Sequence, residues 1–121
     1  MTDAFLTGVA GPEYRQVLDR VLPPGAFALA VADIDMFFQV ELPELYQWHF
    51  TAEDAQRLRP PVLAVVGSET ALIFRDGHTL LKQWMPHVEE LVVPHATHAL
   101  QLMNPSAVAE GLARFFARHT L

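Results

Sequence analysis

Residues 60–70 read PPVLAVVGSET, and this stretch indicates the class of fold. The run from Val62 to Val66 is continuously apolar and rich in β-branched side chains, with prolines before it and Gly67 after it. A short run of this kind is typical of a strand in a parallel sheet that is buried on both faces. The polar residues 67–70 then predict a turn immediately beyond the strand.

Downstream of that turn the pattern alternates between helix and strand. Residues 77–85 predict a helix, residues 90–93 predict a second short strand that Pro94 ends, and Pro105 opens a last amphipathic helix. Parallel strands need a crossover connection, and a helix between the two strands supplies one. We therefore predict an α/β fold with short parallel strands and flanking helices.

Upstream of residue 59 the sequence predicts helices only. They begin at Pro12, Ala26, Leu42 and Thr51. The segment 26–40 repeats its apolar residues at three- and four-residue spacing, which gives one apolar face, and Thr51 and Asp54 have the spacing of a capping box. The character of the chain changes after this region. We therefore expect a helical lobe at 1–59 and an α/β lobe at 60–121.

Composition excludes several classes of function. The chain has 121 residues, which is room for one domain, and its formal net charge of -6 argues against nucleic acid as a partner. It has no cysteine, which excludes disulfides, cysteine zinc sites and a cysteine nucleophile. No stretch reaches the ~18 apolar residues of a membrane span, and no secretory signal is visible. We expect a cytoplasmic protein that does not enter membranes.

Side chains with catalytic chemistry follow both predicted strands. Glu69 lies in the turn after the first strand, and His98 follows the second strand in the segment PHATH at 94–98. The carboxyl ends of neighbouring parallel strands meet at one edge of a sheet, so the two side chains can meet there. A carboxylate beside an imidazole holds its tautomer and stabilises its protonated form. We predict a catalytic pair of His98 and Glu69, with Asp76 as the alternative acid.

Three segments carry a resemblance to a known family: PPVLAVVGSE, KQWMP and VEELVVPHATHALQLMNPSAVAEGLARFFARH, within about residues 60–121. They resemble the C-terminal part of the α/β-hydrolase superfamily, whose members commonly show a strand-G-x-x-acid turn, a histidine after the next strand and a closing helix. Residues 1–58 resemble the helical cap that many members insert before this part. The resemblance implies hydrolysis of an ester, or of a related small acyl or epoxide substrate, with His98 as general base and no cofactor.

The sequence departs from the family pattern at two places. The family acid usually occupies the last position of the G-x-x-D turn, which here is Thr70, one residue after Glu69. The family nucleophile lies in a G-x-S-x-G pentapeptide, and this sequence contains none. Its serines are Ser68, in the acid turn, and Ser106, at the start of the last helix. We therefore expect a truncated hydrolase that is incomplete, or inactive as an esterase by itself.

Other interpretations remain open. The chain is then either a non-catalytic binding or dimerisation module derived from a hydrolase, or a stand-alone enzyme with other chemistry around His98. His95 is interpreted as a loop histidine, and no carboxylate cluster accompanies it to make a metal site. Two strands cannot cover the apolar helical surface, and the strand at 62–66 keeps an open edge. We expect a homo-oligomer or a complex with a separate N-terminal half, acting on a small ester if complete.

Overall fold

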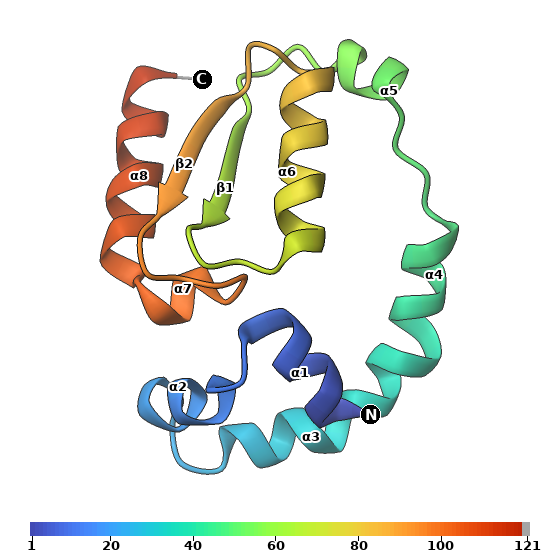
Figure 1. Ribbon diagram of the computed structural model, residues 1–121, viewed down its shortest axis with the longest axis vertical. Coiled ribbons are helices and arrows are strands. Elements are labelled where there is room, and N and C mark those ends of the chain that lie inside the picture. Colours follow the sequence, from blue (N-terminus) through green and yellow to red (C-terminus); the bar gives the residue numbers. More distant parts are fainter. Residues whose placement is uncertain (120–121) are drawn as a thin grey trace.

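The computed structural model describes residues 1–119 and has a mixed α/β architecture that is mostly helical (Figure 1). Its sheet contains β1 (Leu63–Gly67) and β2 (Glu89–Val93), which pair in parallel with Leu63 opposite Glu89 and Gly67 opposite Val93. Helix α6 (Leu72–Trp84) makes the crossover between the strands. The predicted parallel pair is confirmed, and a two-stranded sheet with flanking helices is compatible with part of an α/β fold.

Two helices follow the sheet. They are α7 (Leu100–Met103) and α8 (Pro105–Arg118). Pro105 occupies the start of α8, as predicted, and the Asn104 side chain caps this helix by accepting a hydrogen bond from the Ala107 N–H. Helix α8 packs closely on β2, because a Cβ atom at Gly111 would collide with the Leu91 side chain. Helix α6 packs on β1, so each strand has a helix against it (Figure 1).

The elements of the first 57 residues are all helices, as predicted, but the first of them runs through Gly8 and was not expected. The helices are α1 (Thr2–Ala10), α2 (Tyr14–Val21), α3 (Ala26–Met36), α4 (Leu42–Gln47) and α5 (Ala52–Arg57). A π-helical turn, η1 (Phe37–Glu41), joins α3 to α4, so the expected break between 40 and 42 is absent and the helical backbone runs on. The capping box at Thr51 is confirmed, since its side chain and that of Asp54 each accept from the other's backbone N–H.

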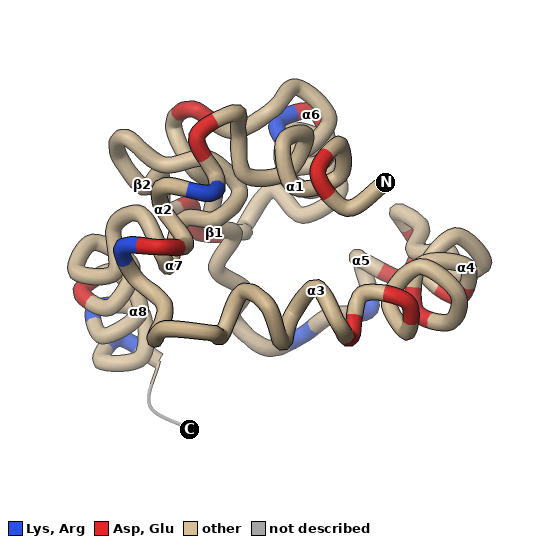
Figure 2. Tube along the Cα trace, turned by 90° about the horizontal axis from the view of Figure 1, so that it is seen from below, with Lys and Arg blue, Asp and Glu red and all other residues tan. Residues whose placement is uncertain are grey.

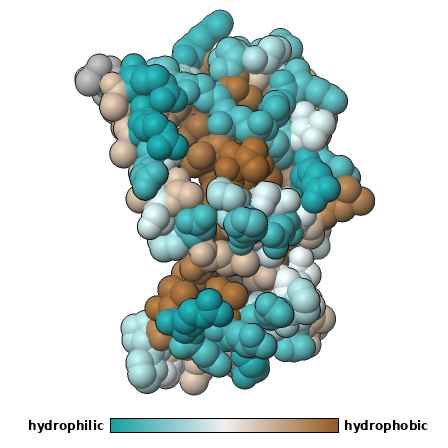
Figure 3. All heavy atoms as spheres, turned by 60° about the vertical axis from the view of Figure 1, so that its left-hand side comes forward, coloured by the Kyte–Doolittle hydropathy of each residue, from teal (hydrophilic) through white to brown (hydrophobic). Residues whose placement is uncertain are grey.

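The chain buries little of its apolar surface. Among residues 1–119, the buried apolar residues are Tyr14, Ala55, Ala64, Met85, Val93, Ala96 and Phe115. The accessible surface is 8563 Å², whereas a compact monomer of 13.5 kDa exposes about 6500 Å². Figure 3 shows apolar surface on both the upper and the lower part of the molecule, with a narrower waist between them. Roughly 2000 Å² more surface is therefore exposed than a compact domain of this mass exposes.

Charged side chains are spread over the surface. Figure 2 shows the Lys and Arg residues apart from one another, among more numerous Asp and Glu residues. Among residues 1–119, no helix has the length and apolar character needed to cross a membrane.

Two adjacent glutamates on β2 tie the sheet to its two helices. Glu89 accepts from Arg118 and His119 at the end of α8, and Glu90 contacts His78 and Lys82 on α6. Neighbouring residues of a strand point to opposite faces, which explains why the two carboxylates reach different helices. Hydrogen bonds from these partners, His119 first for Glu89 and His78 first for Glu90, hold the pKa of both carboxyls below the ordinary 4.5.

We predict that these pairs make the fold sensitive to acid. A lowered carboxyl pKa contributes stability that is complete above the ordinary value and is lost as the pH falls through the lowered value. The double variant E89Q/E90Q should therefore be less stable than the wild type at pH 7, and should lose less further stability between pH 6 and pH 3. Urea unfolding at several pH values measures both effects. Glu110→Gln, which removes only an exposed pair with Arg114, is the matched control, and an equal change in it would contradict the prediction.

Candidate functional site

The turn after β1 and the loop after β2 are joined by backbone hydrogen bonds. The Ser68 N–H donates to the Val93 carbonyl and the Glu69 N–H donates to the Ala96 carbonyl, each at 2.9 Å. The His95 N–H donates to the Ser68 side-chain oxygen, also at 2.9 Å. The two segments that carry Glu69 and His98 are thus held together at the carboxyl ends of the parallel strands, which is the edge where functional groups collect in open α/β sheets.

Gly67 permits this close approach. A Cβ atom at this position would lie closer than 3.0 Å to the carbonyl oxygens of Ala96 and Thr97, which are backbone atoms that cannot swing away. The loop itself needs a left-handed residue, and His95 supplies it with a φ of 55°. The path of the loop to His98 is therefore fixed by β1 as well as by β2.

His98 lies at one end of an apolar groove. Its ring stacks on that of Phe74, the two centroids being 3.7 Å apart and the planes 7° from parallel. The groove has a volume of about 260 Å³ and is lined by β1 residues 64–66, by α6 and by His98. Although His98 is exposed as a residue, partial burial against this wall lowers the pKa of its imidazole below the ordinary value. A lowered pKa keeps the ring neutral at pH 7, as a proton acceptor requires.

The acid predicted for this histidine lies elsewhere. The Glu69 carboxylate approaches His95 Nδ1 at 3.4 Å, with both side chains largely exposed. Among residues 1–119, neither the His98 side chain nor the Asp76 side chain makes a hydrogen bond or an ion pair, so the expected contact of His98 with a carboxylate from 67–76 is not formed. Consecutive residues of a tight turn point in different directions. The Glu69 N–H faces the Ala96 carbonyl, whereas the next residue, Thr70, is buried and its hydroxyl has no protein partner within the described chain.

Neither serine has the geometry of a nucleophile. Ser68 Oγ accepts the His95 N–H and so acts as a brace between turn and loop. Ser106 is in the first turn of α8, which is preceded by α7 rather than by a strand. These positions agree with the absence of a G-x-S-x-G elbow from the sequence.

His78 is a titratable group of the groove that the sequence analysis missed. It comes from α6, lines the same groove as His98, and its Nε2 meets the Glu90 carboxylate. The spacing of His78 and Lys82 by four residues could have indicated one helix face, but nothing local in the sequence shows that Glu90 reaches it. Within residues 1–119, no group of three His, Asp or Glu side chains is placed to hold a metal ion.

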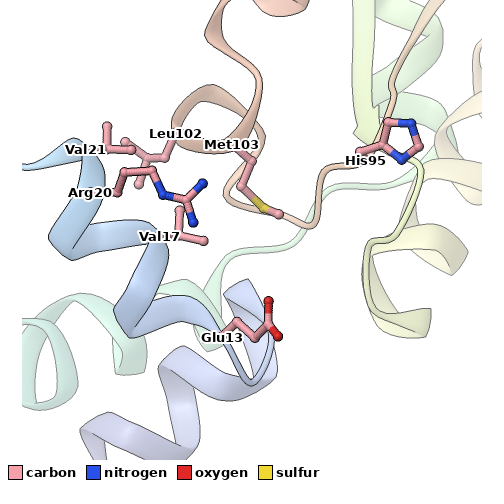
Figure 4. Close-up of a pocket in the computed structure, with 7 residues that line it drawn as sticks. All are labelled: Glu13, Val17, Arg20, Val21, His95, Leu102 and Met103. Carbon is pink, nitrogen blue, oxygen red and sulfur yellow. The ribbon is translucent and has the colours of Figure 1, made fainter.

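A second groove lies on the side of the loop that carries His95. It has a volume of about 300 Å³, and Figure 4 shows Arg20 and Glu13 from the α2 region opposite Met103 and His95. The contact between the end of α1 and this loop is direct, because the Thr97 hydroxyl donates to the Ala10 carbonyl at 3.1 Å. His95 and His98 therefore face different grooves, and only His98 faces the apolar groove along β1.

We predict that Phe74 sets the proton affinity of His98. Replacing Phe74 with alanine hydrates the covered face of the imidazole, so the pKa of His98 should rise toward 6.5, the ordinary histidine value. The sign follows from burial, which disfavours the charged ring. NMR titration of the imidazole protons measures the midpoint directly. Ile73→Ala, at an exposed neighbour in the same groove, is the control, and an unchanged midpoint in Phe74→Ala would contradict the assignment.

Comparison with known proteins gives one relevant similarity. The protein described as "Uncharacterized carboxylesterase nap" from Bacillus subtilis (strain 168) is 30% identical to this chain over 78 residues. The match covers 62% of this chain and 25% of that protein, so the chain spans a quarter of the length of the curated relative it matches. No family model matches, and no solved structure matches significantly. The similarity indicates a distant relationship to an esterase-type hydrolase.

Proposed function

We propose that this chain supplies the histidine part of an ester-hydrolysing site of α/β-hydrolase type, with His98 as the general base. The observation that carries the proposal is the position of His98: it follows the carboxyl end of a parallel strand, faces an apolar groove and has a lowered pKa. The similarity to a carboxylesterase supports the same reaction class. The 121 residues contain no nucleophile elbow, so the nucleophile comes from a different polypeptide segment.

The mechanism assigns each proton. Neutral His98 takes the proton of a hydroxyl nucleophile as its oxygen bonds to the ester carbonyl carbon, and then gives that proton to the departing alcohol. Water then attacks the acyl carbon while His98 accepts its proton. The bond between the acyl carbon and the nucleophile oxygen breaks, His98 returns the proton to that oxygen, and the acid product leaves. A hydrophobic groove beside the base suits an apolar acyl or alcohol group.

Glu69 is our proposed orienting acid, and Asp76 is the alternative. The Glu69–His95 contact is loose and exposed, and such pairs contribute little to stability. Turning the Glu69 carboxylate away from His95 toward the other side of the loop therefore costs little. Thr70 occupies the turn position at which the family pattern has its acid. Its hydroxyl carries no negative charge, so it cannot stabilise an imidazolium as a carboxylate does.

The purified chain alone should not turn over a p-nitrophenyl ester faster than its own His98→Ala variant, because His98 has no nucleophile to activate. Activity should appear in a chimera in which this chain replaces the aligned segment of the Bacillus carboxylesterase, which provides the remainder of a hydrolase. Spectrophotometric release of p-nitrophenol measures both. Turnover by the isolated wild-type chain above that of the His98→Ala variant would contradict the proposal that the nucleophile comes from a different polypeptide segment. A chimera that folds but does not hydrolyse would favour the non-catalytic binding module.

A further inference from the structure

We infer that the outer face of the helical arm formed by α3, η1 and α4 binds a basic amphipathic helix of another protein. The arm is the continuous helical backbone from Ala26 to Gln47, and it runs along the outside of the molecule (Figure 1). It contains no residue of the candidate site, so the inference is independent of the proposed function.

One face of the arm packs inward. Phe37 and Phe38 lie against Phe5 of α1, with ring centroids 4.9 and 5.6 Å from the Phe5 centroid, and Phe27 lies beside Tyr14 of α2. Phe37 and Phe38 follow Phe27 at intervals close to about three helical turns, so the three rings share one side of the arm. This side attaches the arm to the first two helices.

The opposite face is apolar but exposed. Its outer stripe consists of Leu29, Met36, Val40 and Leu45, whose exposed fractions lie between 51% and 70%. Leu29 is two residues from Phe27, which is about 200° around the helix, and Met36 follows Leu29 by about two turns. A row of exposed apolar side chains on one helix face marks an interaction site, and the flexible thioether of methionine adapts to varied apolar partners.

The charges beside the stripe are all negative. Residues 21–56 contain six of the 14 Asp and Glu residues and none of the 8 Lys and Arg residues, so the whole formal charge of -6 lies in this part of the chain (Figure 2). The arm itself carries Asp33, Asp35, Glu41 and Glu44. Within residues 1–119, none of these four carboxylates forms an ion pair. They are complementary to Lys and Arg that flank an apolar helix face.

The charge distribution favours a basic helix over a second copy of this chain. Two arms placed together would oppose like charges, and the residues outside 21–56 carry as many Asp and Glu as Lys and Arg, so a second copy offers no net positive surface. The outer stripe spans roughly 24 Å from Leu29 to Leu45, at ~1.5 Å per residue, so a partner helix of about four to five turns covers it.

Fluorescence anisotropy with labelled model peptides tests the chemistry of the partner. The probe is an ~18-residue peptide with Leu on one helix face and Lys on the other, which is about five turns. It should bind the purified chain at least about tenfold more tightly than a Leu/Glu peptide of the same pattern, and its affinity should fall as the salt concentration rises. A scrambled Leu/Lys peptide without an apolar face should bind as weakly as the Leu/Glu peptide, and binding equal to that of the probe would overturn the inference.

Two double variants test the outer stripe. L29Q/M36Q removes two exposed apolar side chains and should weaken binding of the probe at least about tenfold, without changing the melting temperature of the chain by more than a few degrees. L72Q/I73Q makes the same kind of change at two residues of α6 that are also exposed, and should leave the affinity unchanged. Equal affinities of the two variants for the probe would overturn the assignment of the stripe.

A second pair of variants tests the charges. D33N/E44Q should weaken binding of the probe and reduce its salt dependence, whereas E13Q/E110Q, which removes the same charge outside the arm, should change neither. The same loss in both variants would show that the probe responds to net charge alone and would overturn the inference.

NMR chemical shift mapping locates the bound probe. The amide signals of residues 26–47 should move, and those of α6 and α8 should not; the reverse pattern would overturn the inference. The probe should also bind the folded carboxylesterase chimera, and loss of binding there would assign the outer stripe to the remainder of the hydrolase. A dimer in light scattering that L29Q/M36Q dissociates, without binding of the probe, would assign the stripe to a second copy. Either of these last two results would overturn the inference.

Discussion

Replacing His98 with alanine should lower kcat for ester hydrolysis by the chimera on the order of 10² to 10⁴-fold, the usual contribution of a general acid–base group. His98 faces the groove beside β1 and has a lowered pKa, so it is neutral and available at pH 7. KM should change little, because the loss falls on the proton transfer rather than on ester binding.

His95→Ala is the matched control for this experiment. His95 lies three residues away on the same loop but faces the other groove, and its side chain is 91% exposed, so the variant should retain nearly all activity. Equal losses of kcat in the two variants would show that activity depends on the structure of the loop rather than on the His98 imidazole. Glu69→Gln and Asp76→Asn in the same chimera separate the two proposed acids, since only the orienting acid should lower kcat.

Gly67→Ala should destabilise the isolated chain by about 3 kcal/mol, at the upper end of the cost of overpacking. The added methyl group would overlap the carbonyl oxygens of Ala96 and Thr97, so β1 or the His98 loop must move. Movement of the loop also breaks the hydrogen bond between the Glu69 N–H and the Ala96 carbonyl. Urea unfolding measures the stability loss, and the His98 imidazole chemical shifts report the displacement of the loop.

Gly77→Ala provides the contrast. This glycine lies inside α6, and an added methyl group would meet nothing within 4 Å, so alanine should be neutral or should stabilise the helix by up to ~1 kcal/mol. Wild-type stability in Gly67→Ala would mean that the turn and the loop are not held as closely as the structure shows.

The strands and their direction could be predicted from sequence because the signals are local. A short β-branched run between prolines and Gly67 favours a buried strand, and the helix that follows leaves little choice but a parallel partner. The start of α8 could be predicted equally well, because Pro105 fits the first helical position. The capping box at Thr51 was predicted from its own four residues.

Features that depend on tertiary contact were not predicted correctly. Helix α6 begins at Leu72, five residues before the expected start, because its exposed first turn lacks the apolar spacing that marks a helix in sequence. The short helix α7 was missed for the same reason, as four residues carry no periodicity. The contact partners of Glu69, in a turn, and of Glu90, on a strand, depend on the direction in which each side chain points. The spacing of residues along the sequence does not predict that direction.

The role of His98 is tested most sharply by the pH dependence of kcat/KM for ester hydrolysis by the chimera, with and without Phe74→Ala. The acid limb of this profile reports the pKa of the essential base in the free enzyme. If that base is His98, activity rises with pH through its lowered pKa, and Phe74→Ala shifts the limb to higher pH by as much as it shifts the NMR titration of His98. A limb that stays in place while the His98 titration moves would contradict the assignment of His98 as the catalytic base.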